Sequence, residues 1–97
     1  MKMTRTYKPT IRRDKVEILF TMLESIADGY NKPTIVMYAC GLSWKPLRRM
    51  IDNALNKGWI GLVPERIKDK RTNEQFFVTP SGFRLIRLLE QIILEVY

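Results

Sequence analysis

The order of short segments between residues 33 and 79 constrains the fold of this chain more than any other feature. Proline, glycine and serine recur there and mark the boundaries of short elements. In chain order the region contains an apolar segment (34–40), a turn, a basic amphipathic stretch (44–57) and two apolar runs (59–63 and 75–78) around a charged loop. The sequence therefore predicts two short helices followed by a hairpin of two strands.

Residues 44–57 give the strongest helix prediction. Ser43 is a good N-cap residue, and Lys57-Gly58 is a typical C-terminal end. One face of the helical wheel is apolar and consists of Trp44, Leu47, Met50, Ile51, Ala54 and Leu55. The opposite face is polar and basic and consists of Lys45, Arg48, Arg49, Asp52, Asn53 and Asn56. Trp44 lies on the apolar face, so we expect it to pack in the core and not to stack near a nucleic-acid backbone.

A long apolar helix precedes this region. Asp14 predicts its start as an N-cap, and Gly29 predicts its end. The apolar side covers more than half of the circumference, so this helix must pack against more than one neighbour. Residues 34–40 are predicted to be helical, but the β-branched Ile35 and Val36 keep a strand open as an alternative.

The last helix is predicted to start after Thr79, an N-cap residue followed by proline, and to run to near Tyr97. Only a narrow strip of this helix is polar. A domain of this size can bury one apolar side against the first helix, and the other side calls for a partner.

The charge is high and unevenly placed. The net charge is +7, and the excess lies mainly in residues 1–15 and 44–57, whereas the chain from residue 79 onward is neutral. Such a charge favours polyanionic partners, namely DNA, RNA or an anionic membrane. A generally basic protein with solvated faces is the alternative.

Several functional classes lack support in the sequence. There is no histidine, and the one cysteine, Cys40, is expected to be a core residue of a protein in a reducing, cytoplasmic compartment. No apolar run reaches the roughly 18 residues of a membrane span. Metal-ligand spacings, phosphate-binding glycine loops and a convincing nucleophile or carboxylate pair are missing. We therefore expect no enzymatic activity, metal, cofactor, membrane partner or small-molecule ligand.

The order of elements is that of a helix-turn-helix followed by a β-hairpin wing. It predicts one mostly helical domain of the α+β class. In this layout the basic face of residues 44–57 and the loop at residues 64–74 lie on the same side of the domain, where a DNA duplex can meet both.

Four stretches resemble a family of small archaeal winged-helix DNA-binding proteins. The main one is TIVMYACGLSWKPL at residues 34–47, which is similar to the family's T-x-I-M-Y-x-A-N-L-S-Y-x-x-L. Gly41 replaces a frequent asparagine there, and Ile35 and Ala39 stand where charged residues are common. The other stretches are RDKVEIL at 13–19, NKGWI at 56–60 and VTPSG at 78–82, the last of which is shared with MarR- and PadR-type regulators.

The resemblance covers residues 12–97 and implies a homodimer that binds double-stranded DNA as a transcription regulator or chromatin-associated protein. We expect a basic N-terminal arm (1–12), a winged helix-turn-helix domain (13–79) and a C-terminal dimerisation helix (80–97). The expected dimer interface consists of Phe83, Ile86, Leu89, Ile93 and Val96.

The expected DNA interface has three parts. In the major groove, the recognition helix would contribute Ser43, Lys45, Arg48, Arg49, Asp52 and Asn53, with Asp52 pairing with a neighbouring arginine or accepting from a cytosine. On the backbone or in the minor groove, the wing would contribute Arg66, Lys68, Lys70 and Arg71, and the arm Arg12 and Arg13. For each part, solvated or disordered charge is the alternative. A sequence-tolerant architectural DNA-binding protein and a protein-interaction module without DNA binding also stay open.

Overall fold

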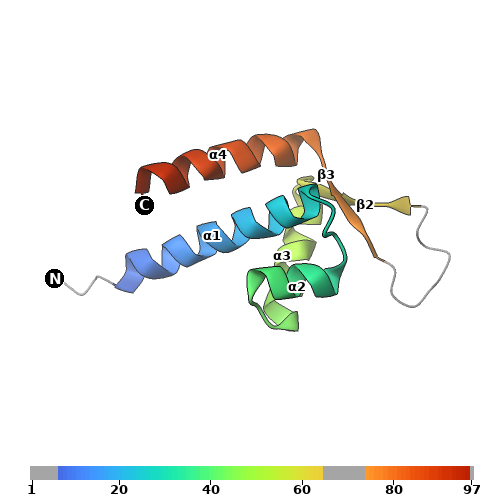
Figure 1. Cartoon of the computed structure of the whole chain (residues 1–97), viewed down its shortest axis with the longest axis horizontal. Helices are drawn as coiled ribbons and strands as arrows, with labels where there is room; N and C mark the ends of the chain where they lie inside the picture. The colour runs from blue at the N-terminus through green and yellow to red at the C-terminus, as the bar shows by residue number, and fades with distance from the viewer. Residues whose placement is uncertain (1–6, 65–73, 97) are drawn as a thin grey trace.

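The computed structural model describes residues 7–64 and 74–96, with side chains from Lys15 onward. The elements of this part of the chain are α1 (Tyr7–Ala27), α2 (Pro33–Cys40), α3 (Trp44–Asn56), β2 (Ile60–Leu62), β3 (Phe76–Val78) and α4 (Pro80–Val96). Figure 1 shows α1 between α4 on one side and the α2–α3 pair on the other, with the hairpin at one end. This arrangement confirms the predicted winged helix-turn-helix, a mostly helical α+β domain.

The central helix of the domain is α1. It contacts α2, α4 and β3, and Met22, Leu23 and Ile26 are buried among them. This confirms that its wide apolar surface has more than one neighbour. The rest of the core consists of Val36, Leu47, Ile51, Ala54, Ile60, Phe76, Val78 and Leu89.

The prediction that the first helix starts at Asp14 is wrong, because α1 starts at Tyr7. Pro9 lies in the first turn of α1, where the amide hydrogen that proline lacks would have no partner within the helix. Pro9 therefore does not interrupt the helix, which continues through Asp14. The part of the predicted arm from Tyr7 onward is helical.

The helix-turn-helix consists of α2, a turn and α3. Because α2 is helical, the strand alternative for residues 34–40 is wrong. Gly41 ends α2 in the left-handed conformation, with φ 68° and ψ 29°, and its N–H donates to the Met37 carbonyl oxygen at 3.0 Å. Asparagine also adopts this conformation more readily than most residues, which explains why glycine can replace it at this turn.

The hairpin is held to the domain through β3. β2 and β3 are antiparallel, with Ile60 opposite Val78 and Leu62 opposite Phe76. On β3, the Phe76 N–H donates to the Asn31 carbonyl oxygen at 3.2 Å, and Asn31 Nδ2 donates to the Phe76 carbonyl oxygen at 2.8 Å. Asn31, in the connection between α1 and α2, thus fastens β3 to the helical part of the domain.

A close junction sets the start of α4. Thr79 Oγ1 accepts a hydrogen bond from the Gly82 N–H at 3.0 Å, which confirms the predicted N-cap. The same hydroxyl can donate to the Gly58 carbonyl oxygen, 2.6 Å away. Gly82 is buried, and a β-carbon there would overlap the carbonyl oxygen of Trp59. The threonine and the glycine of the VTPSG stretch therefore fix α4 against the chain that leaves α3.

Candidate nucleic-acid interface

The two faces of α3 have opposite roles in the domain. Leu47, Ile51 and Ala54 are buried in the core. The opposite face is exposed and carries Lys45, Arg49, Asp52, Asn53 and Asn56. The core anchors the helix, and the domain's own packing leaves its polar face open.

Two predictions at the start of α3 need correction. Ser43 occupies the N-cap position with extended backbone, but within the described part of the chain its side chain makes no capping hydrogen bond. Trp44 is 47% exposed and does not pack in the core as predicted. Trp44 is the first residue of α3, and the buried part of the helix begins one turn later, at Leu47. Both side chains are therefore on the accessible surface beside the basic face.

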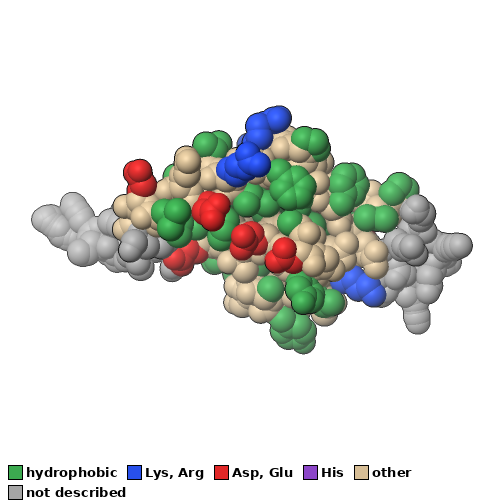
Figure 2. Space-filling model, turned by 45° about the horizontal axis from the view of Figure 1, so that its top comes forward, with side chains coloured by type: hydrophobic (Ala, Val, Ile, Leu, Met, Phe, Trp, Pro, Cys, Tyr) green, Lys and Arg blue, Asp and Glu red, His purple; other side chains and the backbone are tan. Residues whose placement is uncertain are grey.

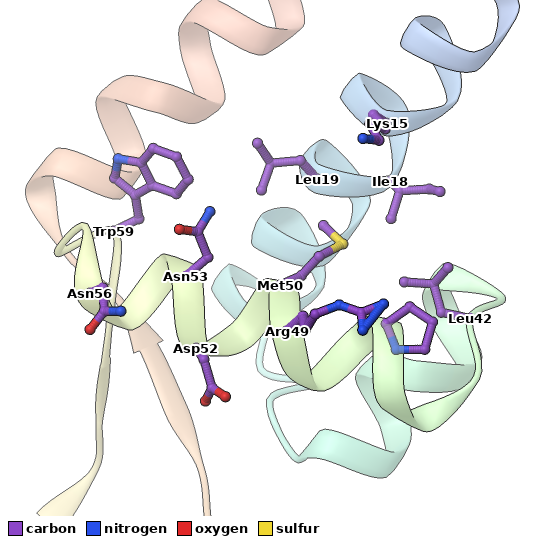
Figure 3. Close-up of a pocket in the computed structure, with 11 residues that line it drawn as sticks. Lys15, Ile18, Leu19, Leu42, Arg49, Met50, Asp52, Asn53, Asn56 and Trp59 are labelled. Atoms are coloured by element: carbon purple, nitrogen blue, oxygen red, sulfur yellow. The ribbon is translucent and has the colours of Figure 1, made fainter.

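A groove of about 800 Å³ lies between α1 and α3, along one edge of the polar face. Its apolar lining includes Ile18 and Leu19, and Figure 3 shows Met50 pointing toward these two residues. Asn53 lies between Leu19 and Trp59 in the same view, whereas Asp52 points away from α1. Arg49 also borders the groove. The polar face of α3 thus has one side toward this groove and one side toward solvent.

Arg48, predicted to bind DNA, is partly exposed and is held by two carboxylates. Its Nη1 donates to Glu74 Oε1 at 2.7 Å and its Nη2 to Glu74 Oε2 at 3.3 Å. Its Nε donates to Asp52 Oδ1 at 3.2 Å. The hydrogen bond with Glu74 is the main cause that raises the pKa of Arg48 above its usual value, while partial burial lowers it. Asp52 therefore pairs with a neighbouring arginine, one of the two roles predicted for it.

This three-residue cluster changes the charge of the proposed interface. One guanidinium and two carboxylates have a formal net charge of −1. Arg48 therefore adds no net positive charge to the polar face of α3. The basic character of that face comes from Lys45 and Arg49, both exposed.

The other predicted contact residues lie outside the described side chains. Arg66, Lys68, Lys70 and Arg71 belong to residues 65–73, which lie outside the described residues. Arg12 and Arg13 belong to α1, but the described side chains start at Lys15. Their contacts with DNA stay predictions.

The last helix exposes large apolar side chains. Leu89 is only 5% exposed and the half-buried Ile86 packs against the core, so both contribute to the domain's own packing. Ile93 is half-buried, and Phe83 and Val96 are exposed. Further exposed apolar residues of α4 are Leu88, Ile92 and Leu94. Figure 2, with the α4 side turned forward, shows apolar side chains at the surface between acidic and basic ones.

Cys40 is half-buried at the end of α2. Its Sγ is 3.9 Å from the Ile18 carbonyl oxygen, to which the thiol can donate. Desolvation by burial raises the pKa of this thiol, so it is less reactive than an exposed one. In the described residues, no cluster of three potential metal-binding side chains occurs. None of the described helices combines the length and the hydrophobicity that a membrane crossing needs.

Two residues that organise the site carry no signal in the sequence. Glu74 is one acid of a charged loop, and no pattern in the sequence predicts that it binds Arg48. Asn31, which fastens β3, was assigned no role. Both interactions join residues far apart in sequence, 26 positions for Arg48 and Glu74 and 45 for Asn31 and Phe76, and periodicity carries no signal for such pairs.

The fold and the polar face of α3 together define a winged-helix protein. A model of a winged helix-turn-helix family matches residues 12–96, and the chain belongs to that family. This membership supports a DNA-binding regulator in general terms.

Two relatives come from the archaeon Methanocaldococcus jannaschii, which agrees with the resemblance to archaeal winged-helix proteins. Uncharacterized protein MJ0290 is 29% identical over 89 residues, which are 92% of this chain and 38% of that protein. Uncharacterized protein MJ0287 is 28% identical over 81 residues, which are 84% of this chain and 74% of that protein. The chain thus spans well under half of the length of MJ0290.

Solved structures of MarR share the fold. The apo form of wild-type MarR from E. coli superposes with a TM-score of 0.65 at 21% identity, covering 94% of this chain and 76% of that one. A structure described as the Multiple Antibiotic Resistance Repressor, MarR, gives a TM-score of 0.66 at 18% identity, covering 98% and 77%. These likenesses confirm the MarR-like winged-helix fold.

Proposed function

We propose that this protein is a homodimer that binds double-stranded DNA and acts as a transcription regulator. The observation that carries the proposal is the exposed polar face of α3, with Lys45, Arg49 and Asn53, on the second helix of a helix-turn-helix. In this class of fold that helix enters the major groove. Arginine can bind guanine through two hydrogen bonds and asparagine can bind adenine in the same way.

The proposed contacts divide into base contacts and phosphate contacts. Arg49 and Asn53 lie one turn apart on α3 and are proposed to face base edges, whereas Lys45, near its start, is proposed to bind phosphate. Ser43 and Trp44, exposed at the same end, extend this surface. The loop that follows β2 and the residues before Lys15 would add phosphate contacts, because they hold most of the remaining cationic side chains.

The proposed dimer is joined through α4. Leu88, Ile92 and Val96 recur every fourth residue and are 57%, 48% and 58% exposed, so they form an apolar stripe on one side of the helix. We give this set the name α4 stripe. If the α4 stripes of two copies pack against each other, both are removed from water. Phe83, also exposed, lies outside the stripe near the start of α4.

The test compares duplex binding by the wild type and by Lys45→Ala/Arg49→Ala. At about 0.1 M salt, loss of the phosphate contact of Lys45 and the base contact of Arg49 should weaken binding roughly 50-fold, since the first is worth about eightfold and the second about 1–3 kcal/mol. The matched control is Arg84→Ala/Arg87→Ala, which removes the same charge from exposed positions of α4. Equal losses for the two double variants would contradict a specific role for α3 and leave only general attraction.

Footprinting on long DNA separates a regulator from an architectural protein. One protected site supports a regulator, and uniform protection supports a sequence-tolerant role. A wild-type protein that shows no shift with duplex DNA and stays monomeric would instead support the protein-interaction module.

A further inference from the structure

The carboxylate of Glu74 lies beside the recognition helix, where a negative charge would repel the phosphates of DNA. It follows directly after residues 65–73, so it marks the point where the chain of the wing enters β3. Its partner, Arg48, lies in the middle of α3. The hydrogen bonds between them, at 2.7 and 3.3 Å, therefore join the recognition helix to the end of the wing.

The geometry of this contact suits a structural link. Two nearly parallel N–H···O bonds between a guanidinium and a carboxylate fix direction as well as distance. Asp52, one turn after Arg48 on α3, accepts from the Arg48 Nε and holds the guanidinium from the helix side. Three of the five N–H donors of Arg48 are thus directed to two carboxylates, and the negative charge of these carboxylates disfavours a phosphate beside them.

Other contacts near Glu74 hold β3 to different parts of the domain. Past Glu74, the Val63 N–H donates to the Gln75 carbonyl oxygen at 2.9 Å, and Phe76 is fastened by Asn31. These bonds hold β3 to β2 and to the α1–α2 connection. The ion pair from Arg48 to Glu74 is the contact of this set that ties the hairpin to α3 itself.

We propose that Arg48 and Glu74 form a brace that sets the position of β3 relative to the recognition helix, and that Arg48 is a positioning residue and not a DNA contact. The proposal deepens the proposed function and rests on it for its DNA-binding part. Because α3 and the hairpin are both proposed to face the duplex, holding β3 against α3 before binding lowers the entropy cost of binding. Glu74 then improves DNA binding despite its charge.

The test is the sign of the effect of Glu74→Gln on duplex binding. If Glu74 only repels phosphate, its neutralisation should tighten binding, and release of Arg48 should tighten it further. If Glu74 is part of the brace, binding should weaken by about threefold to tenfold, the range of a partly exposed bidentate ion pair. Glu90→Gln, which removes one exposed carboxylate from α4, is the matched control and should not weaken binding.

The salt dependence distinguishes positioning from direct contact. Arg48→Gln should weaken binding about as much as Glu74→Gln, the double variant should be no weaker than either, and the salt slope should stay that of the wild type. Lys45→Gln, at the proposed phosphate contact, is the comparison and should reduce the slope by about 0.9. Tighter or unchanged binding by Glu74→Gln, or a slope reduced by about 0.9 in Arg48→Gln, would overturn the proposal.

A second measurement without DNA keeps the brace separate from the proposed function. Amide hydrogen exchange of β3 in the free protein should be about threefold to tenfold faster in Glu74→Gln and in Arg48→Gln, and unchanged in Glu90→Gln. If the wild type does not bind duplex DNA, the proposed function fails, and this exchange still decides whether the brace exists. Normal exchange in both variants would contradict the brace, and faster exchange with unaffected DNA binding would contradict its role in positioning.

Discussion

The helices α3 and α4 are both amphipathic, yet they leave opposite kinds of surface exposed. α3 buries Leu47, Ile51 and Ala54 and exposes a polar face. α4 buries Gly82 and Leu89 and exposes the α4 stripe together with Phe83 and Leu94. Apart from the exposed Trp44, the apolar face of α3 is thus packed within the domain, and a polar ligand suits its open face. The packing of α4 is incomplete, and an apolar partner suits the remainder.

The strongest test of this difference is a pair of neighbouring leucines on α4. Leu89→Ala should lower the free energy of unfolding by about 3 kcal/mol at every protein concentration, because Leu89 is buried within the protomer. Leu88→Ala should cost less than about 1 kcal/mol in dilute solution, since Leu88 is exposed there. Denaturant unfolding at low concentration measures both. Equal losses would contradict the assignment of Leu88 to the outer surface.

The second test asks whether the α4 stripe is an interface. Leu88→Glu/Ile92→Glu should raise the dimer dissociation constant by about a hundredfold, or about 2.7 kcal/mol, because four carboxylates, two from each copy, would have to be buried between the protomers. Sedimentation velocity measures the mass of the particle. Arg87→Glu is the matched control, since it makes the same change in net charge at an exposed position of α4 outside the stripe. A double variant that stays dimeric would exclude the stripe from the interface.

The third test, with the smallest expected effect, asks how well α2 shields Cys40 from solvent. Burial raises the pKa of Cys40. At pH 8, iodoacetamide should therefore alkylate Cys40 at least about threefold more slowly in the folded protein than in the protein unfolded in urea. For the same reason the folded state keeps the thiol proton to higher pH than the unfolded chain does. Its stability should therefore fall as the pH rises through the ordinary thiol range, near about 8.5. Equal alkylation rates in the two states would mean that α2 does not shield Cys40.

The sequence predicted those features that depend on local pattern. The clean division of residues 44–57 into two faces predicted α3 to within a residue or two, and Thr79 followed by proline predicted the start of α4. The two predicted N-cap residues nevertheless differ in their hydrogen bonds. The Thr79 hydroxyl accepts from the Gly82 N–H, whereas the Ser43 side chain makes no capping bond within the described residues. A cap residue predicts a boundary better than it predicts a hydrogen bond.

The sequence did not predict which face of a helix packs against which neighbour. The wheel of α4 shows two adjacent apolar sides, and either could face α1. In the structure the core takes residues from both sides, Leu89 from one and Ile86 from the other, which removes these two from the predicted dimer interface. The ion pair between Arg48 and Glu74 depends in the same way on how the hairpin folds back on α3. Such choices are made by tertiary packing.

The most direct test of the central claim is the salt dependence of duplex binding by the wild-type protein. The claim is that the polar face of α3 and the cationic segments around it bind DNA through phosphate neutralisation. If each protomer neutralises about five phosphates, the logarithm of the binding constant should fall with the logarithm of salt concentration with a slope of about −4 to −5 per protomer. A slope near zero, or no binding at low salt, would contradict the account.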